Sequence, residues 1–216
     1  MILALPPPIV AGEIVRLQTR QHVVALTFDG GGNADGAKGV LKTLRHEHVP
    51  ATFFLTGHFV QSYPLLARAI GRRYPVGNHT VDHLDMLRLS PAAARREVTR
   101  AAKLIQRATG RDPHPFFRFP YGSRNGRVLR MVNGLGYASV RWTVDTWGWM
   151  GLSQQSVRGA VRRVRDHLVP GEIVLMHLGS SRDRSTIDSK ALPAVIHLVR
   201  ARGYRFVTLK GIQAPQ

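Results

Sequence analysis

The sequence contains no cysteine, which excludes disulfide bonds and a thiol nucleophile. This absence leaves the compartment open, because exported proteins of this size also fold without disulfides. No apolar run approaches the roughly 20 residues that a membrane-spanning helix needs, so we expect no membrane span. The apolar start from Met1 to Leu5 ends at three prolines, and it lacks the basic residues and the length of a signal peptide.

Acidic residues are also scarce, since 13 Asp and Glu stand against 31 Lys and Arg and the formal net charge is +18. Such a charge attracts polyanions, which include nucleic acids, anionic lipid surfaces and acidic wall polymers. The basic residues are not accompanied by aromatic platforms or a recognition motif. We therefore expect no specific nucleic-acid partner.

The chain has 216 residues, 44% of them hydrophobic, which is enough for one sizeable core. It shows no internal repeat and no low-complexity linker. We expect one domain over residues 1–216, with its core at about residues 22–210, and a monomer.

Short apolar runs alternate with longer helix-like stretches, which is typical of repeated β/α units around a parallel sheet or barrel. We expect seven strands, at residues 23–28, 51–55, a short run ending at 79, 116–119, 137–144, 173–176 and 204–209. Helices are expected at residues 37–46, in a stretch that is interrupted near Pro64 and runs toward Arg73, at residues 90–110, from 125, at 153–168 and up to about 203. The class is therefore α/β, close to a barrel of about seven parallel strands with outer helices.

The clearest of these helices begins with Ser90 as its N-cap and Pro91 in its first turn, and it ends at Gly110. Its apolar residues form one stripe, and its basic residues lie mostly off that stripe. We interpret the basic side as a solvated outer face rather than a nucleic-acid-binding helix.

Two histidines four residues apart, His79 and His83, follow a Gly-Asn break. On one helical turn the two rings would share a face and could hold one cation. The spacing alone is a weak signal because the chain has ten histidines. Two independently hydrogen-bonded histidines are the alternative.

Polar side chains follow five of the expected strands, at the end where parallel α/β folds carry their chemistry. They are Asp29, the pair His79 and His83, Arg118, Asp145 and His177. A strand that only filled the core would need none of them. Single members have structural alternatives, such as a turn cap, an ion-pair partner or a hydrogen-bonded core histidine, but their coincidence predicts an active site.

The segments at these strand ends resemble, in the same order, the five motifs of polysaccharide deacetylases of the carbohydrate esterase family 4 type, the NodB-homology domain. The segments are 27–29, 79–83, 118–122, 145–149 and 175–177. The resemblance extends from about Val23 to Leu209. It implies a distorted (β/α) barrel and a metal-dependent hydrolysis of N-acetyl groups on sugar polymers, with release of acetate.

By this resemblance, His79 and His83 hold a divalent ion, zinc in the first place, although cobalt or nickel could serve. Asp29 is the general base that takes a proton from water, and Arg118 orients it. His177 is the general acid that protonates the leaving amine.

The same resemblance assigns the substrate contacts. The backbone N–H of Tyr121 stabilises the oxyanion. Leu175 and Trp149 line the pocket for the acetyl methyl group, for which an apolar wall is suitable.

The sequence departs from the family at the third metal ligand, because Gly30 stands where the family usually has an aspartate. We predict Asp35, in the same glycine-rich turn, as the third ligand. Asn33 is a weaker candidate because its amide oxygen is uncharged. The alternative role of Asp35 is to cap the helix that starts near Ala37.

A second departure is Gly148, which stands where the family usually has the aspartate that holds the acid histidine. We predict that Asp145 takes over this role toward His177. Asp183 and Asp188 follow on an expected loop, and we expect both to be solvated.

The resemblance and the charge together favour peptidoglycan as the acetylated glycan, with chitin-type oligosaccharides as the alternative. If the two substitutions by glycine are not compensated, the chain would be a weak or silent glycan-binding homologue. We expect an extracellular or cell-wall location, reached with a leader that this chain does not contain.

Overall fold

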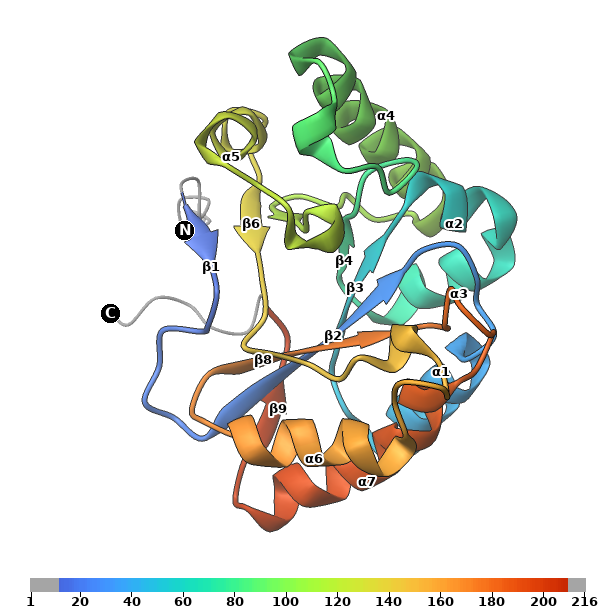
Figure 1. Ribbon diagram of the computed structural model, residues 1–216, viewed down its shortest axis with the longest axis vertical. Coiled ribbons are helices and arrows are strands. Elements are labelled where there is room, and N and C mark those ends of the chain that lie inside the picture. Colours follow the sequence, from blue (N-terminus) through green and yellow to red (C-terminus); the bar gives the residue numbers. More distant parts are fainter. Residues whose placement is uncertain (1–11, 210–216) are drawn as a thin grey trace, which may run out of the picture.

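The computed structural model describes residues 12–209. Within this range the protein forms one curved sheet with helices packed around its outside (Figure 1). The segment from Met1 to Leu5 and the last residue of the expected core lie outside the described residues.

All strand pairs in the sheet are parallel, and the strand order is β1-β6-β5-β4-β3-β2-β8-β7, with β9 also paired to β2. The strands are β1 Glu13–Ile14, β2 Val23–Gly30, β3 Thr52–Leu55, β4 Val76–Asn78, β5 Phe116–Phe117, β6 Ala138–Val140, β7 Val144–Asp145, β8 Glu172–His177 and β9 Arg205–Val207. Within residues 12–209 no pairing joins β7 to β1, so the barrel stays open there.

The predicted fold class is confirmed, but the described part of the chain contains nine strands rather than about seven. The expected strand at residues 137–144 is two strands, β6 and β7, separated by three residues that include the half-buried Arg141 and Trp142. β1 was missed because two residues are too short to show a periodic pattern.

The helices are α1 Ala37–His46, α2 Gly57–Ser62, α3 Pro64–Arg73, α4 Pro91–Thr109, α5 Gly126–Asn133, α6 Val157–His167 and α7 Ile187–Ala201. Most expected bounds hold, but α6 starts four residues later than expected, where the Ser156 side chain accepts the N–H of Gly159. α6 and α7 lie side by side across one side of the sheet (Figure 1). Among residues 12–209 no helix combines the length and apolarity that crossing a membrane requires.

The expected signals at both ends of α4 are confirmed. The Ser90 side chain accepts the N–H of Ala93 (3.3 Å), and Gly110 ends the helix in the left-handed conformation at φ +70°. The buried side of α4 carries Val98 and Ile105, whereas its arginines are exposed, as expected for a solvated outer face.

β2 is the centre of the sheet, because it pairs with β3, β8 and β9 and all eight of its residues are buried. A strand covered on both faces needs a continuous apolar run, which residues 23–28 provide apart from Thr27. Asp29 follows that run at its carboxyl end. The buried charge of Asp29 therefore needs partners from neighbouring strands.

A second buried carboxyl group lies at the opposite end of the sheet. Glu172, the first residue of β8, is fully buried, and its Oε2 accepts the N–H of Val169 (3.1 Å). Its Oε1 has no hydrogen-bond partner among the described residues. Burial raises the pKa of Glu172 from 4.5 to about 7, although the hydrogen bond from Val169 opposes the shift.

This shift predicts how stability depends on pH. Between pH 4.5 and 7 the unfolded chain loses the Glu172 proton while the folded protein keeps it, so the free energy of unfolding falls as the pH rises. Glu172→Gln should remove this loss, because glutamine does not titrate. The change in the free energy of unfolding caused by the substitution should therefore be more favourable at pH 8 than at pH 4.5, by up to about 3 kcal/mol. Urea unfolding at both pH values measures it. An equal effect of the substitution at both would contradict a proton held by Glu172.

Candidate active site

The carboxyl ends of β2, β4 and β8 open into a cavity of about 660 Å³. Every predicted site residue except Arg118 and Asp35 lines this cavity. Trp142, which the sequence did not single out, lines it too. The structure thus brings together residues from distant parts of the chain at the predicted end of the sheet.

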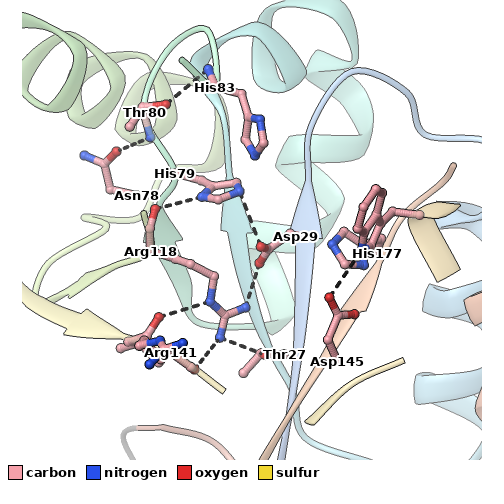
Figure 2. A network of polar contacts seen from close by, with 12 residues as sticks. Thr27, Asp29, Asn78, His79, Thr80, His83, Arg118, Arg141, Asp145 and His177 are labelled. Atoms are coloured by element: carbon pink, nitrogen blue, oxygen red, sulfur yellow. Dashed lines mark hydrogen bonds and ion pairs between the residues drawn. The ribbon is translucent and has the colours of Figure 1, made fainter. Parts of the chain in front are cut away.

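Asp29 lies at the centre of the site. Its Cα is paired in register with that of His177 on the neighbouring β8, so both side chains leave the sheet in the same direction. Its Oδ1 accepts a hydrogen bond from Nη1 of Arg118 (2.7 Å), and its Oδ2 lies 3.3 Å from Nε2 of His79. Figure 2 shows the carboxylate between these two partners.

Arg118 is fully buried and its guanidinium is held on every side. Besides Asp29, it donates to the hydroxyl of Thr27 (3.0 Å) and to the carbonyls of Arg141 (3.1 Å) and Val140 (3.2 Å). Its guanidinium carbon also lies 4.0 Å from the ring centroid of Phe54. These contacts fix the position from which Arg118 orients Asp29.

The charge of Arg118 sets the protonation of Asp29. Burial by itself would raise the pKa of Asp29, but the attraction and the hydrogen bond of Arg118, with the neighbouring histidines, lower it below its ordinary value. Asp29 is therefore ionised at neutral pH.

The backbone of Arg118 fixes the tautomer of His79. Nδ1 of His79 lies 2.8 Å from the Arg118 carbonyl, which can only accept a hydrogen bond, so Nδ1 carries the proton. Burial lowers the pKa of His79, against the attraction of Asp29, so the ring is neutral. Its unprotonated Nε2 then faces the carboxylate of Asp29, and two acceptors at this distance repel each other, which favours a cation close to them.

His83 provides a second neutral imidazole beside His79, with the ring centroids 4.7 Å apart. Burial and the proximity of His79 lower the pKa of His83 to about 3. The prediction that both histidines lie on one helical turn is wrong. They lie on a loop after β4, in which Thr80 (φ +67°) and His83 (φ +57°) take left-handed conformations that turn the second ring back toward the first.

Two residues that the sequence analysis missed hold this loop. Oδ1 of Asn78 accepts the N–H of Thr80 (3.0 Å). Oε2 of Glu97, from α4, accepts the N–H groups of Val81 and Asp82, both at 3.0 Å. A single carboxylate in an otherwise basic helix was the signal that could have pointed to Glu97.

Asp35 does not reach the histidines in this structure. Its carboxylate forms a bidentate ion pair with the guanidinium of Arg184 (2.8 and 2.9 Å). It does not cap α1 either, since the N-cap position is Gly36 and no side chain caps there. Asp35 as third ligand stays a prediction, and it requires the ion pair with Arg184 to open.

The glycine at position 30 leaves no room for a carboxylate in its present surroundings. A Cβ at Gly30 would lie 2.8 Å from Leu55 and 3.3 Å from both Phe59 and Leu178. Among the described residues, no three His, Asp or Glu side chains are arranged to hold a metal ion. The two histidines supply suitable nitrogen donors, but the third protein position is open to assignment.

His177 lies across Asp29 from His79 (Figure 2). Asp145 does not hydrogen-bond His177 in the described structure, because its oxygens accept the N–H groups of Trp147 (2.8 Å) and of the Trp149 indole (3.2 Å). The expectation that Asp188 is solvated is wrong, since Asp188 is 2% exposed and accepts the backbone N–H of His177 (2.7 Å). Asp183 is exposed, as expected.

The predicted substrate contacts lie around the same cavity. Leu175 is buried on β8 and presents an apolar wall, and Trp149 lies beside the His177 ring with the centroids 6.5 Å apart. Tyr121 adopts a left-handed conformation (φ +58°), which is uncommon for a residue with a side chain and is typical of functional sites. Tyr121 is 71% exposed, and its ring packs edge-on against that of His83.

Comparison with known proteins agrees with this geometry. Residues 16–140 match the polysaccharide deacetylase family. The chain is 35% identical to a chitooligosaccharide deacetylase of Bradyrhizobium sp., over 84% of this chain and 86% of the relative. It is 30% identical to a peptidoglycan-N-acetylglucosamine deacetylase of Bacillus cereus, over 86% of this chain and 66% of the relative. The chain therefore belongs to the polysaccharide deacetylase family, hydrolases that act on carbon–nitrogen amide bonds.

Solved structures show the same similarity. The Bc1960 peptidoglycan N-acetylglucosamine deacetylase superposes with a TM-score of 0.85 at 27% identity, over 94% of both chains. BA3943, a carbohydrate esterase family 4 pseudoenzyme from Bacillus anthracis, superposes with a TM-score of 0.82 at 27% identity, over 92% of this chain and 68% of that one. The fold is thus shared by a deacetylase and by a pseudoenzyme.

The buried network around Arg118 predicts the effect of a conservative substitution. Arg118→Lys replaces a planar guanidinium with a single ammonium that cannot reach Asp29, Thr27 and two carbonyls together. We expect the free energy of unfolding to fall by about 3–5 kcal/mol, as measured by urea unfolding. The control Arg88→Lys, at an 88% exposed side chain, should change it by no more than about 0.5 kcal/mol. Equal stability of both variants would contradict the network.

Proposed function

We propose that this protein removes N-acetyl groups from an acetylated glycan, releasing acetate and leaving a free amine. The observation that carries the proposal is the position of Asp29, which is held by Arg118 at one oxygen and faces His79 at the other, with His177 beside it on the neighbouring strand β8. A fixed base and a fixed acid that line the same cavity are what hydrolysis of an amide requires.

In the proposed reaction, Asp29 accepts a proton from water while the water oxygen bonds to the acetyl carbonyl carbon. The backbone N–H of Tyr121 stabilises the negative charge on the carbonyl oxygen. The carbon–nitrogen bond then breaks as His177 gives a proton to the leaving nitrogen. Leu175 packs against the acetyl methyl group, and Trp149 encloses the same side of the cavity.

His79 and His83 would hold a divalent ion, zinc in the first place and cobalt or nickel as alternatives. Both rings are neutral, and Nε2 of His79 has a free lone pair next to an ionised carboxylate, which suits a cation. When bound, such an ion lowers the pKa of water and polarises a carbonyl group. Asp35 is the proposed third ligand, after release from Arg184.

Peptidoglycan is the proposed substrate class. The net charge of +18 attracts an anionic wall polymer more than a neutral chitin-type chain. The names of the relatives cover both substrates, so chitooligosaccharides are the alternative. An extracellular or cell-wall location follows from this substrate and is part of the proposal.

A silent glycan-binding protein is the second candidate. It is favoured by Gly30, whose side-chain direction is filled by apolar groups, and by the likeness to a pseudoenzyme. Zinc calorimetry separates the two candidates. An enzyme should bind zinc tightly and lose that binding in His79→Ala, whereas the silent homologue should show no tight binding in either form.

The direct test is acetate release from N-acetylated peptidoglycan fragments. Asp29→Asn keeps the shape of the side chain but cannot take a proton, so the rate should fall by roughly 10²-fold or more, and a chelator should have a comparable effect. Asp166→Asn, which removes one exposed carboxylate on α6, serves as the control and should leave the rate unchanged. Acetate release that survives both Asp29→Asn and the chelator would refute the mechanism.

A further inference from the structure

We propose that Asp188 is the positioning residue of His177, and that its carboxylate occupies the space that a side chain at position 148 would otherwise fill. The proposal rests on the function proposed above, in which His177 gives a proton to the leaving nitrogen. It assigns a role to a residue that the sequence placed on a solvated loop.

The first observation is the close approach of Asp188 to Gly148. A Cβ built on Gly148 would lie 2.2 Å from Oδ2 and 2.3 Å from Cγ of Asp188. Real Cβ atoms do not approach other atoms so closely, so the carboxylate at 188 and any side chain at 148 exclude one another. Gly148 is therefore required by the position of Asp188, which comes from the first turn of α7.

The second observation is the contact between Asp188 and His177. Oδ2 of Asp188 accepts the backbone N–H of His177 at 2.7 Å and lies 3.7 Å from Nδ1 of its ring. The second distance is too long for a hydrogen bond. Among the described residues, Nδ1 of His177 and Oδ1 of Asp188 are both buried without a hydrogen-bond partner. A hydrogen bond between the His177 ring and the Asp188 carboxylate would give the buried Nδ1 a partner.

This contact orients the ring for proton transfer. With Nδ1 buried against Asp188, the remaining exposed edge of the ring, which carries Nε2, faces the cavity. Burial would lower the pKa of His177, but Asp188, Asp145 and Asp29, the carboxylates that face it from α7, β7 and β2, raise it above its ordinary value. These carboxylates therefore favour the protonated ring, whose Nε2 can deliver a proton.

The competing explanation is that Asp188 only supports the start of α7 and the backbone of β8. Its hydrogen bond with the backbone N–H of His177 would suffice for that role. Asp188→Asn separates the two roles, because an asparagine oxygen still accepts this N–H while the negative charge is lost.

For a positioning role, Asp188→Asn should lower kcat for acetate release by roughly 10²-fold, with little change in KM. The pKa of the His177 ring, followed by NMR in a protein labelled at histidine, should fall. Asp166→Asn, which also removes one negative charge, should change neither quantity. An unchanged kcat and an unchanged His177 pKa in Asp188→Asn would overturn the proposal.

Moving the carboxylate from position 188 to position 148 is the most direct test. Asp188→Ala should lose activity, and Gly148→Asp alone should be destabilised because its Cβ has no room. The double variant G148D/D188A has room for the new carboxylate, so its kcat for acetate release should be at least tenfold higher than that of Asp188→Ala. A double variant no more active than Asp188→Ala, although folded by circular dichroism, would overturn the proposal.

The NMR measurement keeps the two proposals distinguishable, because it needs no turnover. A wild-type protein without acetate release would refute the proposed function. A His177 pKa that still falls in Asp188→Asn would then support the contact alone. Activity in the wild type with no effect in the Asp188 variants would refute the positioning role alone.

Discussion

The buried ion pair between Arg118 and Asp29 is the interaction on which the site depends. A charge without water is stable only when it is paired and fully hydrogen-bonded. The guanidinium meets this condition through side chains of β2 and carbonyls at the end of β6 and directly after it. The carbonyl of the same arginine holds Nδ1 of His79. One residue thus sets both the orientation of the Asp29 carboxylate and the tautomer of His79.

The fold and the location of the site could be predicted from the sequence because both depend on local patterns. Continuous apolar runs such as residues 23–28 indicate strands of a parallel sheet, and the polar residue after each run marks the same end of that sheet. Asp29, His79 and His177 were found in this way. Helix ends with a clear chemical signal, such as Ser90 and Gly110, were predicted for the same reason.

The rest could not be predicted because it depends on contacts between residues far apart in the chain. The left-handed backbone at Thr80 and His83 is imposed by Asn78 and by Glu97 on another element, so the spacing of the histidines wrongly indicated a helical turn. Asp188 follows His177 by eleven residues, and only the docking of α7 shows that it returns to the site. The partner of Asp35, Arg184, is equally remote.

Gly30 and Gly148, where the resemblance to the family implies aspartates, have different physical surroundings. The space beside Gly148 is filled by a carboxylate from α7, so the charge near His177 is kept. The space beside Gly30 is filled by Leu55, Phe59 and Leu178, so no charge is supplied from that direction. In the proposed function, the acid therefore keeps a neighbouring carboxylate, whereas the third ligand of the cation has to come from another position than Gly30.

The most direct test of a cation site at His79 and His83 is a crystal structure of the protein soaked with zinc and acetate, the product of the proposed reaction. We expect zinc bound to both histidines and acetate in the same cavity, with its methyl group against Leu175. Zinc bound elsewhere, or acetate absent from the cavity while zinc occupies both histidines, would contradict the proposed site.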